Sequence, residues 1–119
     1  MNIESFRIYC LKKRGVTEEF PFDENTLVFK VMGKIFALTD LVDIPFTINL
    51  KCDPERAIEL RERYEAVQPG YHMNKKHWNT VIIDNSIPEI EILEMIDHSY
   101  QLIVDKLPRG EKLKLGKMI

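Results

Sequence analysis

The stretch from Pro69 to Thr80 holds the residues of this 119-residue chain that are best suited to bind a ligand. It contains two lysines, two histidines, a tyrosine and the only tryptophan, and no acidic residue interrupts it. Lysine contacts phosphate, asparagine hydrogen-bonds phosphates or base edges, and flat rings pack on sugars or bases. These residue types predict a surface for something anionic or planar. The candidate binding residues are Lys51, from a neighbouring predicted strand, and His72, Asn74, Lys75, Lys76, His77, Trp78 and Asn79.

The same residues also have a structural interpretation. Tyr71 and Trp78 can be core or hinge residues with solvated lysines beside them, and for Trp78 burial is favoured because tryptophan is highly buried on average. Pro69 is expected to end a helix and Thr80 to begin a buried strand, so part of this composition serves the connection between them. From the residues alone, the binding and structural interpretations have equal weight.

Metal binding and catalysis find little support in the spacing of the histidines and cysteines. His72 and His77 are five residues apart, Cys52 and His98 are distant, and no Cys-x-x-Cys or His-Glu-x-x-His is present, so no metal is expected. Cys52 precedes a predicted helix N-terminus, but a small buried residue at a strand end is the favoured interpretation. Without a glycine-rich phosphate loop, the sequence predicts no cofactor and no enzyme. An enzyme using either loop histidine would need a group that orients the imidazole.

The composition is that of one soluble globular domain spanning residues 1–119. Hydrophobic residues make up 45% of the chain and charged residues 30%, with a net charge of −2. No apolar run approaches the length of about 18–20 residues that a membrane span needs, and the N-terminus lacks the layout of a signal peptide. These features predict a cytoplasmic protein in which Cys10 and Cys52 are unpaired, buried thiols.

The charges are unevenly distributed along the chain. Residues 1–14 carry four cations and one acid, residues 69–80 two cations, and residues 106–119 five cations and one acid. Residues 84–105 instead carry six acids and no lysine or arginine. The sequence therefore predicts a basic side and an acidic side, and local potential steers an anionic ligand more than the total charge does.

Several segments have the composition of strands and turns. Residues 27–31 and 34–38 predict a hairpin with the two-residue turn Met32-Gly33. Residues 46–51 alternate between apolar and polar side chains, which indicates a half-buried strand, and residues 80–83 predict a short buried strand. Residues 16–25 are expected to form a loop in which Phe20 and Phe22 cover the core.

The remaining segments contain residues that predict where helices begin and end. Asn2 is an acceptable N-cap for a helix over residues 3–14, and Asp53-Pro54-Glu55 begins a helix expected to stop before Pro69. Ser86-Ile87-Pro88-Glu89 predicts a capping box for a long helix that ends near Leu107. Residues 109–119 are expected to be a basic, frayed tail. Together the order predicts an α+β fold, with a mainly antiparallel sheet packed in two layers against helices.

Several blocks of the chain, in order, resemble the MmcQ/YjbR family of small bacterial proteins. The resemblance covers essentially the whole chain. It is carried by Leu27-Val28-Phe29-Lys30-Val31, Gly33-Lys34-Ile35-Phe36-Ala37-Leu38, Asn49-Leu50-Lys51-Cys52-Asp53-Pro54-Glu55, the whole run from Pro69 to Thr80, Ser99-Tyr100 and Leu107-Pro108.

The resemblance implies a compact α+β fold related to the CyaY-like arrangement. It also implies a proposed DNA-binding role through a double-wing surface, in which hairpin and loop segments contact the duplex. The residues of this chain that match the polar pattern of the family are Lys51, His72, Asn74, Lys75, Lys76, His77 and Asn79, with Trp78 between them.

The leading hypothesis is a non-enzymatic protein that contacts the phosphate backbone of double-stranded DNA through residues 69–80 and Lys51. Its first rival is a module that binds a protein partner or a small anionic ligand with the same surface. A concave pocket would favour the module, and one contiguous positive face would favour nucleic acid. No membrane or metal partner is expected, and the sequence predicts no particular oligomeric state.

Overall fold

The computed structural model describes residues 1–118 and contains six strands and four helices. In chain order these are α1 (Ile3–Leu11), β1 (Val16–Glu19), β2 (Thr26–Val31), β3 (Lys34–Asp40), β4 (Thr47–Lys51), α2 (Pro54–Arg63), β5 (Val67–Pro69), β6 (Trp78–Ile82), α3 (Glu89–Asp105) and α4 (Arg109–Gly116).

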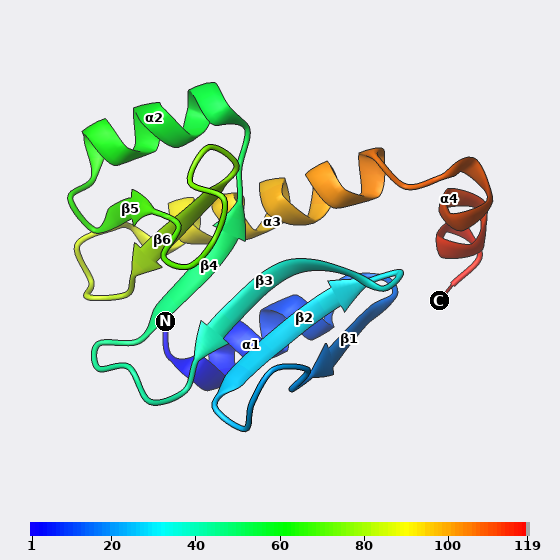
Figure 1. Cartoon of the computed structure of the whole chain (residues 1–119), viewed down its shortest axis with the longest axis horizontal. Helices are drawn as coiled ribbons and strands as arrows, with labels where there is room; N and C mark the ends of the chain where they lie inside the picture. Colours follow the sequence, from blue (N-terminus) through cyan, green and yellow to red (C-terminus); the bar gives the residue numbers. More distant parts are fainter. Residues whose placement is uncertain (119) are drawn as a thin grey trace.

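The strands form one antiparallel sheet in the order β1-β2-β3-β4-β6-β5. Helices α1 and α3 cover one face of this sheet, and the opposite face carries no helix in Figure 1. We call this uncovered side the open face. The predicted α+β fold, with a mainly antiparallel sheet packed against helices, is confirmed.

Strand register determines which side chains reach the open face. Leu38 lies opposite Asn49, and Asn49 lies opposite Thr80, so these three side chains share one face. The preceding row pairs Ala37 with Leu50 and faces the helices. The polar positions Thr47, Asn49 and Lys51 therefore face away from the helix-covered core, as their alternation predicts.

Apolar side chains from the sheet and helices form the core on the helix-covered side. Phe6 of α1 packs edge-on against Phe29, with ring centroids 5.5 Å apart, and Phe36 packs edge-on against Tyr100 of α3 at 5.4 Å. The two free cysteines are buried, which confirms the predicted unpaired thiols. No helix within residues 1–118 has the length and apolar character needed to cross a membrane.

The predicted hairpin is confirmed, including its turn. Met32 has φ of 49° and Gly33 has φ of 78°. Two successive residues with positive φ are the geometry that matches the twist of the flanking strands, and glycine adopts it without steric cost. β2 and β3 consequently pair closely on either side of this turn.

Two strands that the sequence did not predict form the two edges of the sheet. Residues 16–19, expected to be loop, form β1 along β2, because an edge strand needs pairing on one side only and tolerates a polar sequence. The helix expected to reach Pro69 ends at Arg63, and Val67–Pro69 forms β5. The predicted lid is also wrong, since Phe20 and Phe22 are 49% and 67% exposed.

The helix ends differ from expectation in three places. Ser86 does not cap α3, because Asp84 Oδ1 accepts hydrogen bonds from its backbone and hydroxyl, and α3 begins after Pro88. α1 ends at Leu11, three residues early. The expected frayed tail contains α4, and its last residue, Ile119, lies outside the described residues.

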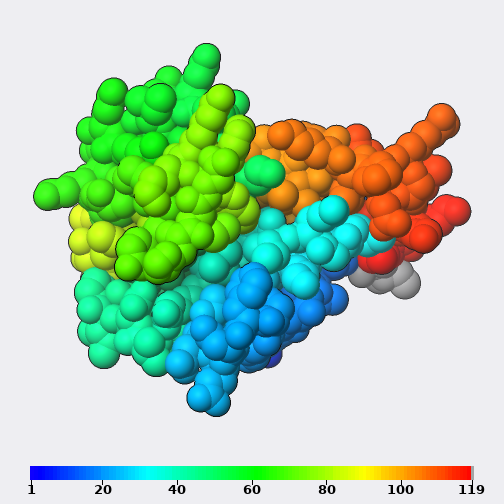
Figure 2. Space-filling model, viewed as in Figure 1, coloured from blue at the N-terminus to red at the C-terminus, as the bar shows by residue number. Residues whose placement is uncertain are grey.

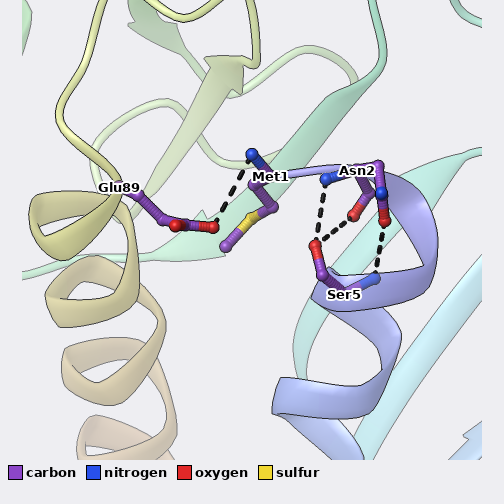
Figure 3. Close-up of polar contacts among 4 residues, drawn as sticks. All are labelled: Met1, Asn2, Ser5 and Glu89. Atoms are coloured by element: carbon purple, nitrogen blue, oxygen red, sulfur yellow. Dashed lines mark hydrogen bonds and ion pairs between the residues drawn. The ribbon is translucent and has the colours of Figure 1, made fainter.

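Asn2 caps α1 as predicted. Its side chain accepts a hydrogen bond from the backbone of Ser5 at 2.8 Å, and the Ser5 hydroxyl accepts one from the Asn2 backbone at 3.0 Å (Figure 3). The amino group of Met1 lies 3.6 Å from Glu89 Oε1 (Figure 3). This contact joins the start of α1 to the start of α3.

Ion pairs partly neutralise the acidic segment 84–105. Besides Glu89, Glu91 pairs with Arg63 at 3.5 Å, and Asp97 pairs with Lys13. The basic residues near the end of α1 and the acids of α3 therefore meet each other in part, instead of forming two separate charged sides.

Candidate nucleic-acid interface

The predicted binding stretch forms a tight connection between two strands. We call residues 70–77 the β5–β6 loop. Gly70 N–H donates to the Trp78 carbonyl oxygen at 2.8 Å, which closes the base of the loop. A Cβ added to Gly70 would lie 2.8 Å from Trp78 Cβ, so only glycine allows this approach. Trp78 itself is half-buried at the start of β6.

Two predicted binding residues hold the loop in shape. Asn74 Oδ1 accepts hydrogen bonds from the backbone of Lys76 at 3.0 Å and of His77 at 3.3 Å. Lys75 Nζ donates to the Gly70 carbonyl oxygen at 3.1 Å. These contacts fix the backbone without a ligand, so Asn74 and Lys75 have a structural role whatever else they contact.

Arg61 of α2 ties the loop to the body of the protein. Its Nε donates to Asn79 Oδ1 at 2.7 Å, and its Nη2 donates to the carbonyl oxygens of Trp78, at 3.2 Å, and of Lys75. A planar guanidinium can make these contacts at once because its donors have a fixed fork geometry. Asn79 is 3% exposed and committed to Arg61, so its side chain oxygen is not available to a ligand.

Lys51 lies where β3 and β4 stop pairing. Its backbone N–H donates to Ser99 Oγ at 2.9 Å, and the Ser99 hydroxyl donates to the Phe36 carbonyl oxygen of β3. The last paired residues are Ala37 and Leu50. The buried Ser99 hydroxyl of α3 thus bridges the two strands where they separate, and this contact fixes the position of Lys51.

Lys51 and the loop belong to one surface. Lys51 lies opposite Trp78 in the sheet, and the next residue, Cys52, donates its N–H to the His77 carbonyl oxygen at 2.8 Å. Partial burial lowers the pKa of Lys51, and the positive charge of Lys106, beyond the end of α3, lowers it further. The ammonium groups of Lys51 and Lys106 are therefore near each other.

We call Lys51, Lys76, His77 and Lys106 the basic surface. Lys76 and Lys106 are exposed, and no carboxylate in residues 1–118 forms an ion pair with any of the three lysines. Figure 2 shows the β5–β6 loop (yellow-green) and the end of α3 (orange) on the same side of the molecule. The surface therefore combines uncompensated positive charge from three parts of the chain.

His72 lines a different region of the structure from Lys51, Lys76 and His77. It has φ of 58°, and its ring stacks on Tyr71 with centroids 4.1 Å apart. His72, Tyr71 and Lys75 line a concave region on the open face of the sheet, which we call the open-face groove. The predicted site residues are thus divided between two regions.

The open-face groove has a volume of about 900 Å³. Its floor is formed by the outward side chains of β2, β3, β4, β6 and β5, and the β1–β2 and β3–β4 connections line it opposite the loop. Three aspartates from those elements, Asp23, Asp40 and Asp43, are among the lining residues. The sequence did not indicate this groove, because its acids come from the β1–β2 connection, the end of β3 and the β3–β4 connection.

Neither loop histidine has the surroundings of an acid–base catalyst. Within residues 1–118, no carboxylate pairs with and no carbonyl accepts from the imidazole of His72 or His77. Burial raises the pKa of the Cys52 thiol to about 11, so the group is protonated at neutral pH. The nearby His98 accepts a hydrogen bond from Asp53 N–H at 3.2 Å. Burial lowers the pKa of His98, which favours the neutral imidazole.

Three residues that position the site were not among the predicted ones. Arg61 belongs to a helix whose charges nearly cancel, so its sequence gives no signal of a special role. Ser99 lies in one of the blocks that carry the family resemblance, and Lys106 lies in the basic C-terminal segment. The family resemblance at Ser99 and the basic segment at Lys106 are both visible in the sequence, but no sequence pattern indicates that these two residues lie beside Lys51.

Comparisons with known proteins identify the family of this chain. The YjbR family model matches residues 11–102. The uncharacterized protein YjbR of Escherichia coli (strain K12) is 37% identical over 115 residues, which are 97% of each chain. The uncharacterized protein YbdF of Escherichia coli O157:H7 is 40% identical over 97 residues, which cover 81% of this chain and 79% of YbdF.

Solved structures show the same fold. The crystal structure of Deinococcus radiodurans protein DR2400 superposes with a TM-score of 0.91 at 40% identity, covering 97% of this chain and 88% of that one. A Pseudomonas syringae protein superposes with a TM-score of 0.74 at 32% identity, covering 86% of this chain and 98% of its own. With a matching family model and relatives along nearly its full length, this chain belongs to the YjbR family.

Proposed function

We propose that this protein binds double-stranded DNA through phosphate contacts made by the basic surface. The observation that carries the proposal is that Lys51 and Lys106, whose positive charges act on each other, form no ion pair with a carboxylate in the described part of the chain. Two neighbouring ammonium groups repel each other, and a phosphate between them would relieve this repulsion. DNA supplies such anions at regular spacing.

The surface is also held in place before a ligand arrives. Ser99 fixes the backbone of Lys51, and Arg61 fixes the loop that carries Lys76 and His77. A preorganised surface loses less conformational entropy when it binds. Trp78, pressed against Gly70, supports the loop from its base.

The expected binding is weak and independent of DNA sequence. The net charge of −2 opposes association at long range, and the basic surface offers few lysines. Binding through phosphates alone has a dissociation constant of about 10⁻⁴ to 10⁻⁶ M at physiological salt. We therefore expect affinity in this range for any duplex.

Fluorescence anisotropy with a labelled duplex tests the proposal. We expect the logarithm of the affinity to fall linearly with the logarithm of salt concentration, and each of Lys51→Ala, Lys76→Ala and Lys106→Ala to reduce the slope by about 0.9. Lys12→Ala is the matched control, because Lys12 is exposed just after α1, on the helix-covered side. Absence of binding at low salt, or equal slopes for all four variants, would contradict the proposal.

The alternative of a small anionic ligand receives less support from the geometry. Its predicted pocket would combine His72, Lys75 and Trp78. His72 and Lys75 do line the open-face groove, but Trp78 is not among its lining residues and three aspartates are. Carboxylates beside the site would repel an anion.

A further inference from the structure

The open-face groove has apolar walls that the fold leaves uncovered. Leu38 and Ile82 contribute to its floor, and Phe22, Pro69, Tyr71 and Met73 contribute to its sides. Phe22 is 67% exposed and Tyr71 is 70% exposed. Scattered apolar residues on a surface need no explanation, but an apolar group that lines a concave region marks a binding site.

The neighbouring β3–β4 connection extends this apolar character. Val42 and Ile44 are largely exposed on either side of Asp43, which lines the groove. Figure 2 looks onto the open face and shows the β1–β2 connection (blue) and the β5–β6 loop (yellow-green) standing around it. A ligand in the groove would therefore meet apolar side chains from the β1–β2 connection and the β5–β6 loop, with Val42 and Ile44 exposed beside Asp43.

The charge of the groove favours a cationic ligand. Asp40 Oδ1 accepts from Val42 N–H at 3.0 Å, and Asp43 Oδ2 accepts from the Thr47 hydroxyl at 3.1 Å, so each carboxylate uses one oxygen locally. Neither carboxylate, nor that of Asp23, forms an ion pair with a cation of residues 1–118. The one lysine that lines the groove is already bonded to a backbone carbonyl.

The floor of the groove also presents a hydrogen-bond donor, the side-chain amide nitrogen of Asn49. Asn49 is 9% exposed, and its Oδ1 accepts from the Thr80 hydroxyl at 2.5 Å. No acceptor among the described residues pairs with its side-chain nitrogen, which lies in a residue lining the groove. This nitrogen is therefore reachable from solvent, since every buried side-chain polar atom of the described residues has a hydrogen-bond partner, and a carbonyl oxygen in the groove would replace water as its acceptor.

We infer that the open-face groove binds an extended peptide segment of a partner protein, one that carries apolar side chains and a lysine or arginine. Such a segment supplies all three complementary features. Its apolar side chains would cover Leu38, Ile82 and Tyr71, its cation would meet Asp40 and Asp43, and its backbone carbonyl would accept from Asn49. This inference does not rest on DNA binding, which uses residues that do not line the groove.

Two synthetic peptides test the inference on the unmodified protein. The first is a capped heptapeptide of alternating leucine and arginine, and the second has glutamate in place of each arginine. We expect the arginine peptide to shift the backbone amide resonances of Leu38, Asn49 and Thr80 in a heteronuclear NMR titration, and the glutamate peptide to leave them in place. Unshifted resonances with the arginine peptide, or equal binding of both peptides, would overturn the inference.

A variant pair assigns the charge requirement to the groove. In Asp40→Asn with Asp43→Asn, each amide keeps an oxygen for its local hydrogen bond while the charge is lost. We expect the affinity for the arginine peptide to fall about tenfold, or about 1.4 kcal/mol. Asp105→Asn, at the end of α3, is the matched control and should leave the affinity unchanged. An equal loss in both variants would show that general electrostatics, and not the groove, binds the peptide.

Discussion

The basic surface and the open-face groove take different residues of the same loop and have opposite charge. On one side, Lys51 and Lys106 approach each other without an acid partner. On the other, Asp40 and Asp43 line an apolar groove without a cation partner. The twelve residues from Pro69 to Thr80 therefore do not make one site. They separate two regions, each suited to a different class of ligand.

This difference changes the meaning of the composition of the loop. In the sequence alone, the lysines and histidines of residues 69–80 suggest one positive patch. In the structure, the backbone of His77 contacts the residue that follows Lys51, whereas His72 and Lys75 line the groove with aspartates. Variants that act on both regions, on the basic surface alone, or on the groove alone can therefore test whether the two are independent.

Arg61→Ala is expected to have the largest effect, because it acts on both regions. It removes hydrogen bonds to Asn79 and to the carbonyl oxygens of Lys75 and Trp78. The Trp78 oxygen still accepts from Gly70, but the buried Asn79 Oδ1 is left unpaired, which costs about 1–3 kcal/mol. We expect the free energy of unfolding, measured by urea denaturation, to fall by about 3 kcal/mol. The matched control is Arg63→Ala on the same helix.

Arg63 makes only an exposed ion pair with α3, and such pairs contribute about 0–1 kcal/mol. The difference in free energy of unfolding between the two arginine variants therefore measures the contribution of the contacts between Arg61 and the loop. If both variants lost the same free energy, Arg61 would not hold the loop in solution. Affinity for both DNA and the arginine peptide should fall in Arg61→Ala alone.

Ser99→Ala is expected to have an intermediate effect that is confined to the basic surface. Loss of the hydroxyl leaves the N–H of Lys51 and the carbonyl oxygen of Phe36 without their partner, which should cost about 2 kcal/mol. Ser86→Ala, an exposed serine in a turn, should cost less than about 0.5 kcal/mol. DNA affinity should fall in Ser99→Ala and peptide affinity should not. A parallel loss of both would mean that the two regions are coupled.

The smallest effect is expected from pH and is confined to the groove. Hydrogen bonds from the backbone of Asn25, at 2.9 Å, and Thr26, at 2.7 Å, lower the pKa of Asp23. The contribution of these bonds is fully present above the unfolded value of about 3.9 and is lost as pH falls through the lower, folded pKa. The amide resonances of both donors should titrate with a midpoint below that value.

Asp23→Asn supplies the control for this titration. The amide oxygen can accept the same two hydrogen bonds but carries no titrating charge, so the resonances of Asn25 and Thr26 should become independent of pH in this range. A midpoint at or above the ordinary aspartate value would contradict the expected order of the β1–β2 connection. The basic surface should not respond, because Asp23 lies outside it.

The sequence predicted those elements of the fold whose signals are local. The Met32-Gly33 turn and the Asp53-Pro54 helix start depend on residues that are adjacent in the chain, and both are observed. β1 was missed because a polar edge strand shows little hydrophobic alternation. β5 was missed because Val67 continues the apolar spacing of the preceding helix, although the helix ends at Arg63.

The candidate site was predictable in composition but not in arrangement. The run of unusual residues between Pro69 and Thr80 is visible in the sequence, and the structure places it on one loop. The contacts that organise it join residues far apart in the chain, such as Arg61 with Asn79 and Ser99 with Lys51. No local sequence pattern predicts such pairs. The aspartates of the groove could not be predicted as a group for the same reason, because they come from separate segments of the chain.

The way in which Arg61 holds the loop has a consequence for how the family can diverge. Its Nη2 contacts the backbone carbonyl oxygens at positions 75 and 78, and not their side chains. Those contacts persist for any residue at either position that keeps the backbone path. Descendants of one ancestral protein can therefore exchange the side chains that face a ligand while the shape of the loop is inherited intact.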